Sequence, residues 1–431
     1  MRFASTRNHA EQVTLSAALE RGLAADGGLY MPTEWPQLAP SADPQDLPAL
    51  ALQLLQPFAA GDVLQHELPA IVREAFNFPA PLTGVAPGAP ISPETTNVLE
   101  LFHGPTAAFK DFGARFLAAA LARLPRERAL QILVATSGDT GGAVAAAFHR
   151  RERVEVAVLF PQGLVSPTQE RQLTCWDANV RSFAVRGRFD DCQRLVKQAF
   201  ADTELRERFQ LSSANSINLG RLLPQMVYYW SASLTVQRRF GLPACFAIPS
   251  GNLGNATACV WARRLGAPIG TILLAHNANS TVPDYLRDGI FTPRPSIATL
   301  SSAMDVGNPS NLERLNALYP DAPALGGALL ALSVDDERTR MRIREDFASQ
   351  GRIWCPHSAV AAEGCARVRA ASAAAGVWSV VATAHPAKFR EIIEPLIGRP
   401  VPMPAALARL YERPVRCEQI EPTLQALKQS L

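Results

Sequence analysis

The sequence predicts an α/β fold with two αβα domains, each built on a parallel sheet, a ligand cleft between them, and a small, mainly helical N-terminal domain. The 431 residues exceed what one ordinary hydrophobic core holds, which favours more than one domain. From about residue 95 onward, short runs that are apolar throughout alternate with stretches of helical periodicity. Such runs are typical of parallel strands covered by helices on both faces.

Proline sets the N-terminal unit apart from the rest. Two proline-rich stretches, 31–48 and 78–93, indicate loop or linker, because proline fixes φ and lacks a backbone donor. Residues 49–76 between them have helical periodicity. We expect this unit to pack beside the core. The predicted division is an N-terminal domain at 1–80, a core of two α/β lobes at 81–390 and a C-terminal segment at 391–431.

Six apolar runs are predicted to be strands, and a polar turn follows most of them. The strands are predicted at 129–136, 154–160, 180–187, 243–249, 271–275 and 377–383, and helical patterns occur at 112–124, 143–151, 190–200 and 250–265. Ligands of parallel sheets bind at the carboxyl ends of the strands. The Gly-, Ser- and Asn-rich turns at those ends are therefore the first candidates for a binding site.

Bulk composition argues against several partners. The net charge is only +3, which predicts no nucleic acid and no membrane partner. The N-terminus lacks the apolar core of a signal peptide, and no apolar run reaches transmembrane length. The seven cysteines are scattered, with no CxxC pair, which indicates reduced thiols and a cytoplasmic protein. Cys355 and His357 lack further ligands at metal spacing, so no metal is expected.

Lys110 has an unusual setting for a lysine. It follows Ala107, Ala108 and Phe109 and precedes the mostly apolar helical pattern at 112–124. Burial disfavours the charged form of an amine, and a neutral amine is a nucleophile toward an aldehyde. The alternative is a lysine that lies along a helix surface with its ammonium in water, the usual case. The small residues before it leave room for a flat ring, which favours a Schiff-base lysine.

The sequence PSGNLGNATA, at 249–258, predicts an anion site where a strand passes into a helix. Gly251 and Gly254 let backbone amides converge on an anion, and a helix N-terminus favours negative charge. Asn252 and Asn255 suit a compact monophosphate. The loop lacks the GxGxxG of a dinucleotide site and the GK[ST] of a Walker loop. A simple turn is the alternative.

Two further turns carry polar side chains at strand ends. In TSGDTGG, at 136–142, Ser137, Thr140 and the amides around Gly138 suit a carboxylate. In TAHPAKF, at 383–389, the Thr383 hydroxyl suits a ring nitrogen, with a local turn hydroxyl as the alternative.

These motifs, in this order, resemble those of pyridoxal-phosphate enzymes of the tryptophan-synthase-β type. More narrowly, the chain resembles the threonine synthases of the long bacterial and fungal kind. The stretches that match that subfamily are the opening at 5–36, SANSINLGRLLPQ at 213–225, DVGNPSNLERL at 305–315 and CPHSAVAAEG at 355–364. The resemblance spans nearly the whole chain and implies that the cleft between the two lobes holds pyridoxal 5'-phosphate.

The resemblance also implies a role for each site residue. Lys110 matches the catalytic lysine that binds the cofactor covalently, and Thr383 matches the hydroxyl at its pyridine nitrogen. The loop around the cofactor phosphate comprises Gly251, Asn252, Leu253, Gly254 and Asn255. The loop around the substrate carboxylate comprises Ser137, Gly138, Asp139 and Thr140, while Asn215, Ser216, Asn218 and Arg221 fall where the family keeps polar groups toward the substrate phosphate. Short-type relatives place an asparagine near the cofactor O3′; DFGARF has none, which leaves that contact unassigned.

The implied activity is that of a lyase, threonine synthase, which converts O-phospho-L-homoserine and water to L-threonine and phosphate in the final step of threonine biosynthesis. A serine/threonine dehydratase or another β-replacement enzyme of the same fold is an alternative, but it leaves the N-terminal signature and NSINLGR unexplained. A non-catalytic homologue that binds phosphorylated metabolites is a third possibility, against which the intact Lys110 argues. The sequence leaves the oligomeric state open between monomer and homodimer.

Overall fold

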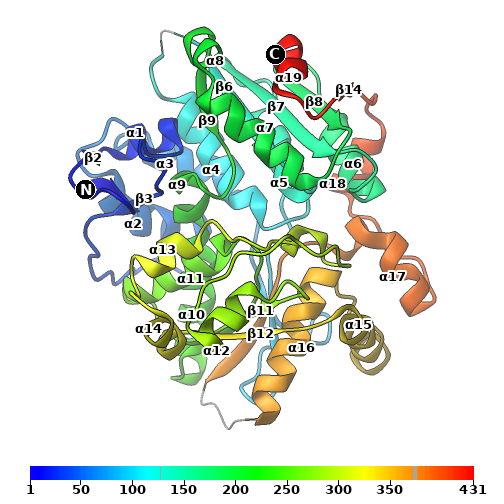
Figure 1. Ribbon diagram of the computed structural model, residues 1–431. Coiled ribbons are helices and arrows are strands. Elements are labelled where there is room, and N and C mark those ends of the chain that lie inside the picture. The colour runs from blue at the N-terminus through cyan, green and yellow to red at the C-terminus, as the bar shows by residue number, and fades with distance from the viewer. Residues whose placement is uncertain (127, 372–375) are drawn as a thin grey trace.

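A computed structural model describes residues 1–126, 128–371 and 376–431. Two α/β lobes lie one above the other, and the N-terminal unit packs at their junction on one side (Figure 1). This arrangement confirms the predicted fold class of two parallel-sheet lobes with an added N-terminal domain. Within the described residues, no helix is both long and apolar enough to cross a membrane.

The first lobe contains a five-stranded sheet in the order β14-β8-β7-β6-β9, with all neighbours parallel. Its strands are β6 (Leu130–Ala135), β7 (Val154–Pro161), β8 (Val180–Val185), β9 (Gln210–Ser213) and β14 (Glu418–Ile420). The helices of this part are α4 (Lys110–Ala122), α5 (Asp139–Phe148), α6 (Pro167–Thr174), α7 (Phe189–Ala201) and α8 (Thr203–Arg208). All six residues of β6 are buried, as expected of a central strand covered on both faces.

The second lobe contains a six-stranded sheet in the order β12-β11-β10-β13-β5-β4. Only the β4–β5 pair is antiparallel. The strands are β4 (Leu82–Gly84), β5 (Asn97–Glu100), β10 (Ala244–Pro249), β11 (Ile269–His276), β12 (Leu330–Ser333) and β13 (Val377–Ala382). The chain thus enters this lobe through β4 and β5, builds the first lobe, and returns to complete the second sheet.

Helices of the second lobe cover both faces of its sheet and form the connections around the cleft. They are α9 (Leu219–Leu222), η1 (Leu223–Gln225), α10 (Met226–Phe240), α11 (Gly254–Arg264), α12 (Thr281–Asp288), η2 (Ser302–Met304), α13 (Leu312–Asn316), α14 (Ala322–Ala328), α15 (Asp336–Gln350), α16 (Pro356–Ala371) and η3 (Pro386–Phe389). The α16 helix packs on β10, β11 and β13, whereas α10 and α11 pack on each other and on the same sheet.

The N-terminal unit is mainly helical but also holds a small antiparallel sheet, β2-β1-β3, that the sequence did not predict. Its elements are β1 (Phe3–Ser5), β2 (Gln12–Val13), α1 (Leu15–Arg21), β3 (Tyr30–Pro32), α2 (Leu47–Ala59) and α3 (Leu68–Ala75). Strands of two or three residues are too short to show the alternation of apolar and polar residues by which a strand is predicted. Buried Arg314 donates to the Tyr30 carbonyl at 3.1 Å, so the unit is joined to the core by polar contacts as well as by packing.

The C-terminal segment packs on both lobes: its first helix contacts α15 of the second lobe, and its later elements return to the first lobe. It contains α17 (Arg390–Ile397), α18 (Ala405–Tyr411), β14 and α19 (Leu424–Ser430). The β14 strand extends the sheet beside β8, and α19 packs on α7 (Figure 1).

Candidate active site

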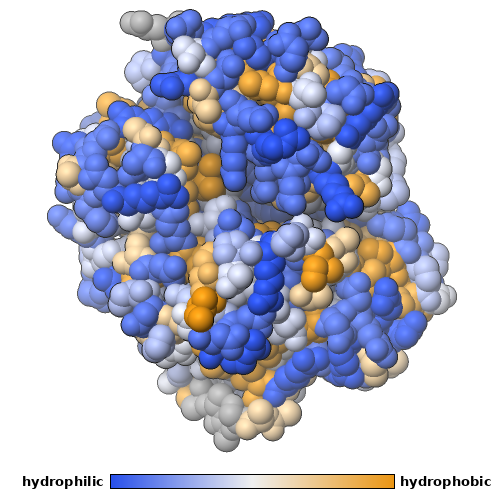
Figure 2. All heavy atoms as spheres, viewed as in Figure 1, coloured by the Kyte–Doolittle hydropathy of each residue, from blue (hydrophilic) through white to orange (hydrophobic). Residues whose placement is uncertain are grey.

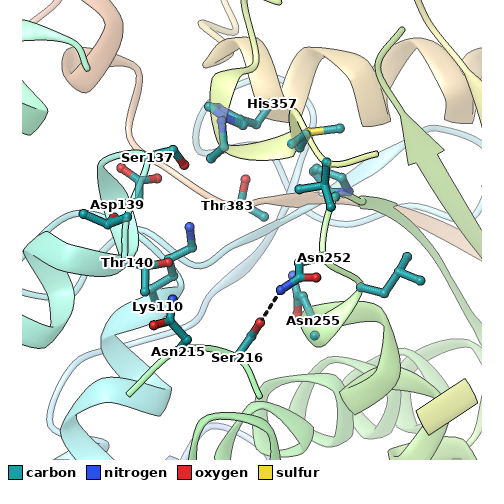
Figure 3. A pocket seen from close by; sticks show the side chains of 18 of the residues that line it. Lys110, Ser137, Asp139, Thr140, Asn215, Ser216, Asn252, Asn255, His357 and Thr383 are labelled. Atoms are coloured by element: carbon teal, nitrogen blue, oxygen red, sulfur yellow. Dashed lines mark hydrogen bonds between the residues drawn. The ribbon is translucent and has the colours of Figure 1, made fainter. Parts of the chain in front are cut away.

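A pocket lies where the two lobes meet, and segments from both lobes line it. The surface on this side is mostly polar and is hollowed at the junction (Figure 2). Figure 3 shows side chains from both lobes facing the same space. The predicted residues that line it are Lys110, Ser137, Asp139, Thr140, Asn215, Ser216, Arg221, Gly251, Asn252, Leu253, Gly254, Asn255 and Thr383.

Backbone pairing places Lys110 beside Thr383. The segment before α4 forms a bridge with the segment after β13, at Ala108 and Ala384. The Phe109 N–H donates to the Thr383 carbonyl at 2.8 Å, and the His385 N–H donates to the Ala107 carbonyl at 3.0 Å. The first residue of α4 is therefore fixed against the carboxyl end of a strand from the second lobe, although the two lie far apart in the sequence.

The Lys110 amine is suited to nucleophilic chemistry. Burial lowers its pKa to about 8; the Asp139 carboxylate opposes this effect, and the charges of Arg221 and Lys388 reinforce it. An amine with this pKa is partly neutral near pH 7–8, which a Schiff-base lysine and a general base both require. The lowered pKa of Lys110 thus agrees with the apolar setting predicted from the sequence.

A buried ion pair crosses the cleft next to this lysine. Lys388, in η3, lies 2.7 Å from Oδ1 of Asp139, at the start of α5, and also donates to the Thr106 carbonyl at 3.0 Å. Gln169 donates to the same Asp139 oxygen at 2.9 Å. Burial alone would raise the pKa of Asp139, but the ammonium groups of Lys388 and Lys110 hold it well below its usual value. The sequence did not identify Lys388 or Gln169, although Lys388 sits in a turn as apolar as that of Lys110.

The loop that starts α5 has a shape fixed by one hydroxyl. Thr136 Oγ1 accepts hydrogen bonds from the Gly138 and Gly141 amides, both at 2.9 Å. Gly138 has φ +129°, and an added Cβ would lie 2.4 Å from Cδ of Gln169. Ser137 and Thr140 line the pocket on this side, as Figure 3 shows. Their position at a helix N-terminus suits a carboxylate.

The loop before α11 has the features expected of a phosphate site. Leu253 adopts a left-handed conformation, φ +62°, immediately before the helix begins at Gly254. An added Cβ on Gly251 would lie 2.7 Å from Cα of Met304, so only glycine fits without displacing the backbone opposite. Asn255 is 6% exposed, and its Nδ2 has no partner among the described residues. A buried donor beside a helix N-terminus fits an anionic phosphate.

Asn252 connects this loop to the segment predicted to meet the substrate. Its Nδ2 donates to Ser216 Oγ at 2.8 Å (dashed in Figure 3), and its Oδ1 accepts from the Ser310 amide at 2.6 Å. Asn311 also donates to Ser216 Oγ, at 3.3 Å. Asn215 lines the pocket while its amide donates to the Ala135 carbonyl at 2.9 Å. The predicted cofactor-phosphate loop and the predicted substrate-phosphate segment therefore form one hydrogen-bonded wall of the pocket.

Arg221 supplies a buried positive charge to the same wall. The residue is 2% exposed, its Nη1 donates to the Ala214 carbonyl, and its Nε has no partner among the described residues. Burial lowers its pKa to about 10, which leaves it charged at neutral pH. No carboxylate forms a salt bridge with it in the described part of the chain. A desolvated guanidinium of this kind suits an anionic ligand.

The prediction that Asn218 meets the substrate is wrong. Its side chain is fully buried outside the pocket and caps α9: Oδ1 accepts from the Gly220 amide, and Nδ2 donates to the carbonyls of Leu19 and Ser213. Asparagine is a favoured N-cap residue, so this position serves local structure.

His357 is a pocket residue whose role the sequence did not indicate. Its Nε2 accepts from the Ala303 amide at 3.1 Å, so the proton of the neutral ring is on Nδ1, which is buried without a partner among the described residues. Burial lowers its pKa to about 4, which keeps the ring neutral. The Sγ atom of the neighbouring Cys355 lies 3.1 Å from Ser358 Oγ. Three buried nitrogens of this pocket, on Asn255, Arg221 and His357, thus have no hydrogen-bond partner in the described part of the chain.

Comparisons with known proteins agree with this geometry. Residues 98–384 match the family of pyridoxal-phosphate dependent enzymes, 2–76 the threonine synthase N terminus, and 358–431 the threonine synthase C-terminal family. The chain is 39% identical to threonine synthase of Haemophilus influenzae over 427 residues, which cover 98% of this chain and 97% of that protein.

Solved structures agree as well. The crystal structure of threonine synthase from Escherichia coli has a TM-score of 0.89 and 37% identity, covering 100% of this chain and 99% of that one. The pyridoxal-phosphate-bound threonine synthase from Brucella melitensis has a TM-score of 0.89 and 33% identity, covering 100% and 98%. These matches extend over the N-terminal unit, both lobes and the C-terminal segment, and the chain belongs to the threonine synthase family of pyridoxal-phosphate-dependent enzymes.

Proposed function

We propose that this chain converts O-phospho-L-homoserine and water to L-threonine and phosphate, with Lys110 as the catalytic base. The observation that carries the proposal is the convergence of three features in one pocket. These are an amine with a pKa of about 8, a glycine-containing loop at the start of α11, and a separate buried guanidinium on Arg221. One anion site suits the cofactor phosphate and the other a phosphorylated substrate.

The residues present fit pyridoxal phosphate. We assign the cofactor phosphate to the loop from Gly251 to Asn255, the aldehyde carbon to Lys110 and the pyridine nitrogen to the Thr383 hydroxyl, which points into the pocket (Figure 3). When bound, the cofactor supplies an electron sink for negative charge that develops on the substrate carbons. A hydroxyl at the ring nitrogen moderates that sink, which suits elimination and replacement chemistry.

The proposed roles of the protein groups follow from their positions. Ser137, Gly138, Asp139 and Thr140 form the loop that binds the substrate carboxylate, and the Asp139 carboxylate is held by Lys388 and Gln169. Arg221, with Asn215 and Ser216, binds the substrate phosphate and holds the charge that grows on it as the Cγ–O bond breaks. The free Lys110 amine removes the proton from Cα and moves protons at Cβ and Cγ; water then adds at Cβ, and a proton returns to Cα.

The domain boundaries and the location belong to the same proposal. We assign residues 1–80 to an N-terminal domain, 81–390 to the catalytic core and 391–431 to a C-terminal segment, and we place the enzyme in the cytoplasm. None of the seven cysteines forms a disulfide within the described residues, and six of them are buried, which supports a reducing compartment. Limited proteolysis that released residues 1–80 as an independent, mobile piece would contradict the packed arrangement.

Product analysis tests the reaction. A dehydratase releases a 2-oxo acid and ammonia, whereas the proposed reaction keeps the amine. With O-phospho-L-homoserine, the enzyme is expected to release phosphate and threonine in equal amounts. Phosphate release with 2-oxobutyrate as the main product, or faster turnover of threonine than of phosphohomoserine, would contradict the proposal.

The rate at which the apoenzyme takes up pyridoxal phosphate is expected to depend on pH through Lys110. Its pKa of about 8 lies below the ordinary value because of burial, so the neutral, nucleophilic fraction grows as the pH rises. The rate of covalent incorporation should increase roughly fivefold between pH 7 and pH 8 and level off above about pH 9. Stopped-flow absorbance measures it directly. Lys388→Met removes a charge that lowers the pKa of Lys110 and should move the midpoint upward; a midpoint near 10 in the unaltered enzyme would contradict this assignment.

Gly251→Ala is expected to weaken cofactor binding and to destabilise the protein. The new Cβ would lie 2.7 Å from Cα of Met304 and 3.2 Å from the Ala303 carbonyl oxygen, so one backbone segment of the pocket must move. Overpacking of this kind costs about 1–3 kcal/mol. Gly254→Ala is the matched control for the backbone clash, because the three atoms nearest its Cβ all belong to side chains, the closest being Cβ of Ser216 at 3.2 Å. Equal unfolding temperatures and equal cofactor affinities for both variants would show that the contact with Met304 is unimportant.

A further inference from the structure

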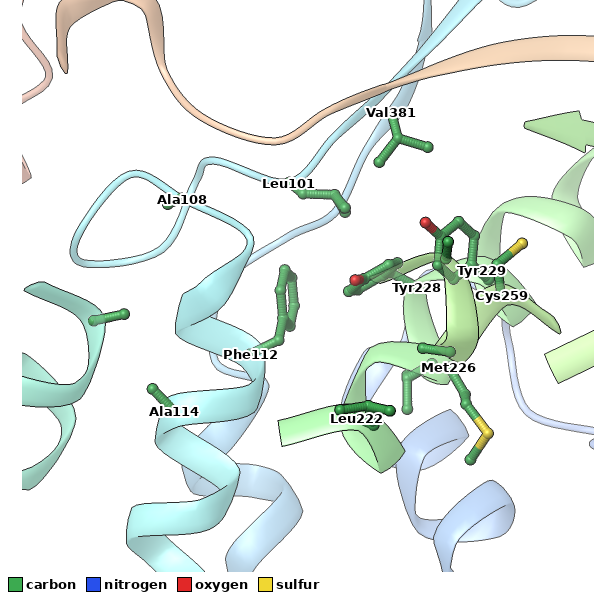
Figure 4. Packing of buried hydrophobic residues seen from close by; sticks show 14 of the residues in the cluster. Leu101, Ala108, Phe112, Ala114, Leu222, Met226, Tyr228, Tyr229, Cys259 and Val381 are labelled. Atoms are coloured by element: carbon green, nitrogen blue, oxygen red, sulfur yellow. The ribbon is translucent and has the colours of Figure 1, made fainter. Parts of the chain in front are cut away.

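Two adjacent buried tyrosines converge on one residue of the pocket. Tyr228 and Tyr229, near the start of α10, both donate their hydroxyls to Oδ1 of Asn255, at 2.5 and 2.9 Å. Their ring centroids are 4.8 Å apart, and the rings lie among apolar side chains that include Phe112 and Cys259 (Figure 4). Both tyrosines are fully buried.

The two hydroxyls act on the pocket through their hydrogen bonds to Asn255, whereas the rings account for the packing. Burial raises the pKa of both hydroxyls well above the ordinary value, so each remains a hydrogen-bond donor at neutral pH. A buried hydroxyl costs stability unless it is hydrogen-bonded, and phenylalanine would fill the same space without that cost. Tyr228 also lies 3.2 Å from Gln225 Oε1, but its single proton goes to the closer oxygen, on Asn255.

This arrangement fixes the orientation of the Asn255 amide. A carbonyl oxygen has two lone pairs, and the two tyrosines occupy both. The amide NH2 is consequently the group that Asn255 presents to the pocket, and it has no partner among the described residues. It lies at the second residue of α11, where the helix N-terminus favours negative charge. The opposite orientation would turn a carbonyl oxygen toward a bound anion.

We propose that Tyr228 and Tyr229 are positioning residues that hold the Asn255 amide with its NH2 group toward the cofactor phosphate. By doing so they make the site prefer phosphorylated pyridoxal to pyridoxal itself. The inference rests on the assignment, proposed above, of the loop from Gly251 to Asn255 to the cofactor phosphate.

The test compares two probes that differ only in the phosphate. Full-length apoenzyme is titrated with pyridoxal phosphate and, separately, with pyridoxal, which reaches Lys110 but cannot contact Asn255 through a phosphate. The variants are Tyr228→Phe, Tyr229→Phe, the double variant, Asn255→Ala and the triple variant. Tyr285→Phe, which removes a hydroxyl from a buried tyrosine outside the pocket, is the control. Thermal unfolding of each apoenzyme shows whether the fold is retained. We expect it to be, because the Tyr→Phe variants keep the buried rings.

The double variant is expected to bind pyridoxal phosphate at least about tenfold more weakly, because the amide is no longer held toward a charged group, while pyridoxal affinity changes less than about twofold. In the Asn255→Ala background, the tyrosine substitutions should cause no further loss of affinity for pyridoxal phosphate, as expected if the tyrosines act through Asn255.

Equal weakening of the binding of both probes, or no weakening of either, overturns the inference. If Asn255→Ala weakens pyridoxal phosphate alone and the tyrosine variants do not, the inference is wrong and the loop assignment stands. If Asn255→Ala has no effect on either probe, the loop assignment and the inference are both wrong.

Discussion

The Lys110→Ala enzyme is expected to fold but to lose at least about 10³-fold in kcat, since one substitution removes both the covalent attachment and the general base. Alanine is tolerated structurally, because no described side chain accepts a hydrogen bond from the lysine amine and Ala is the best helix former for the first position of α4. Treatment of the unaltered enzyme with borohydride should fix pyridoxal phosphate on the peptide that contains Lys110. The variant should give no fixed adduct.

The nearby Lys388 is the natural control for this result. It is fully buried, but its ammonium is held by Asp139 at 2.7 Å and by the Thr106 carbonyl at 3.0 Å, so it is not a free nucleophile. Lys388→Met should still yield an adduct on Lys110. Peptide mapping that placed the adduct on Lys388 would contradict the assignment of the catalytic lysine.

Arg221→Ala is expected to lower kcat/KM for O-phospho-L-homoserine about 10²–10³-fold while the enzyme keeps its cofactor, because the charge acts on the phosphate of the substrate as it leaves. In the proposed assignment, the cofactor phosphate is bound by the neutral donors of the loop before α11, including the Asn255 NH2 group, which has no partner among the described residues. In the same assignment, the substrate phosphate contacts Arg221, a buried cation that lines the same pocket. Cofactor content is measured by absorbance, and turnover by phosphate release.

Arg221→Lys separates charge from geometry. A lysine keeps the charge but lacks the planar fork, so it should recover only part of the loss. Inorganic phosphate, used as a competitive inhibitor, should lose affinity in parallel with the fall in kcat/KM. If Arg221→Ala lost the cofactor and the reconstituted variant turned over at the normal rate, the two phosphate assignments would have to be exchanged.

The fold was largely predictable because the long strands are mostly apolar and mostly buried. The predicted runs at 129–136, 154–160 and 377–383 correspond to β6, β7 and β13 to within two residues at each end. The short strands were missed: β9 contains the sequence QLSS and is only half buried, so no run of apolar residues marks it. The order of strands in each sheet was not predicted, since it depends on pairings between distant segments, such as that of β5 with β13.

The site was predictable as a set of loops but not as a set of contacts. Lys110, Ser137, Asn255 and Thr383 were identified from turns at strand ends, and the structure brings them into one pocket. The error at Asn218 arose because sequence does not show whether a polar side chain caps a helix or faces a ligand.

The residues that support the site were missed for a related reason. Tyr228 and Tyr229 lie on a helix where aromatic residues usually mean core, and their rings are indeed core. Only the three-dimensional contact with Asn255 shows that their hydroxyls also act on the pocket.

The central claim is that a new C–O bond forms at Cβ of the substrate while its amine is retained. Turnover of O-phospho-L-homoserine in water enriched in oxygen-18 tests this most directly, with mass spectrometry of the isolated threonine. The account predicts one labelled oxygen in the threonine hydroxyl for each phosphate released, since that oxygen comes from water. Threonine with an unlabelled hydroxyl, or phosphate released without threonine, would contradict it.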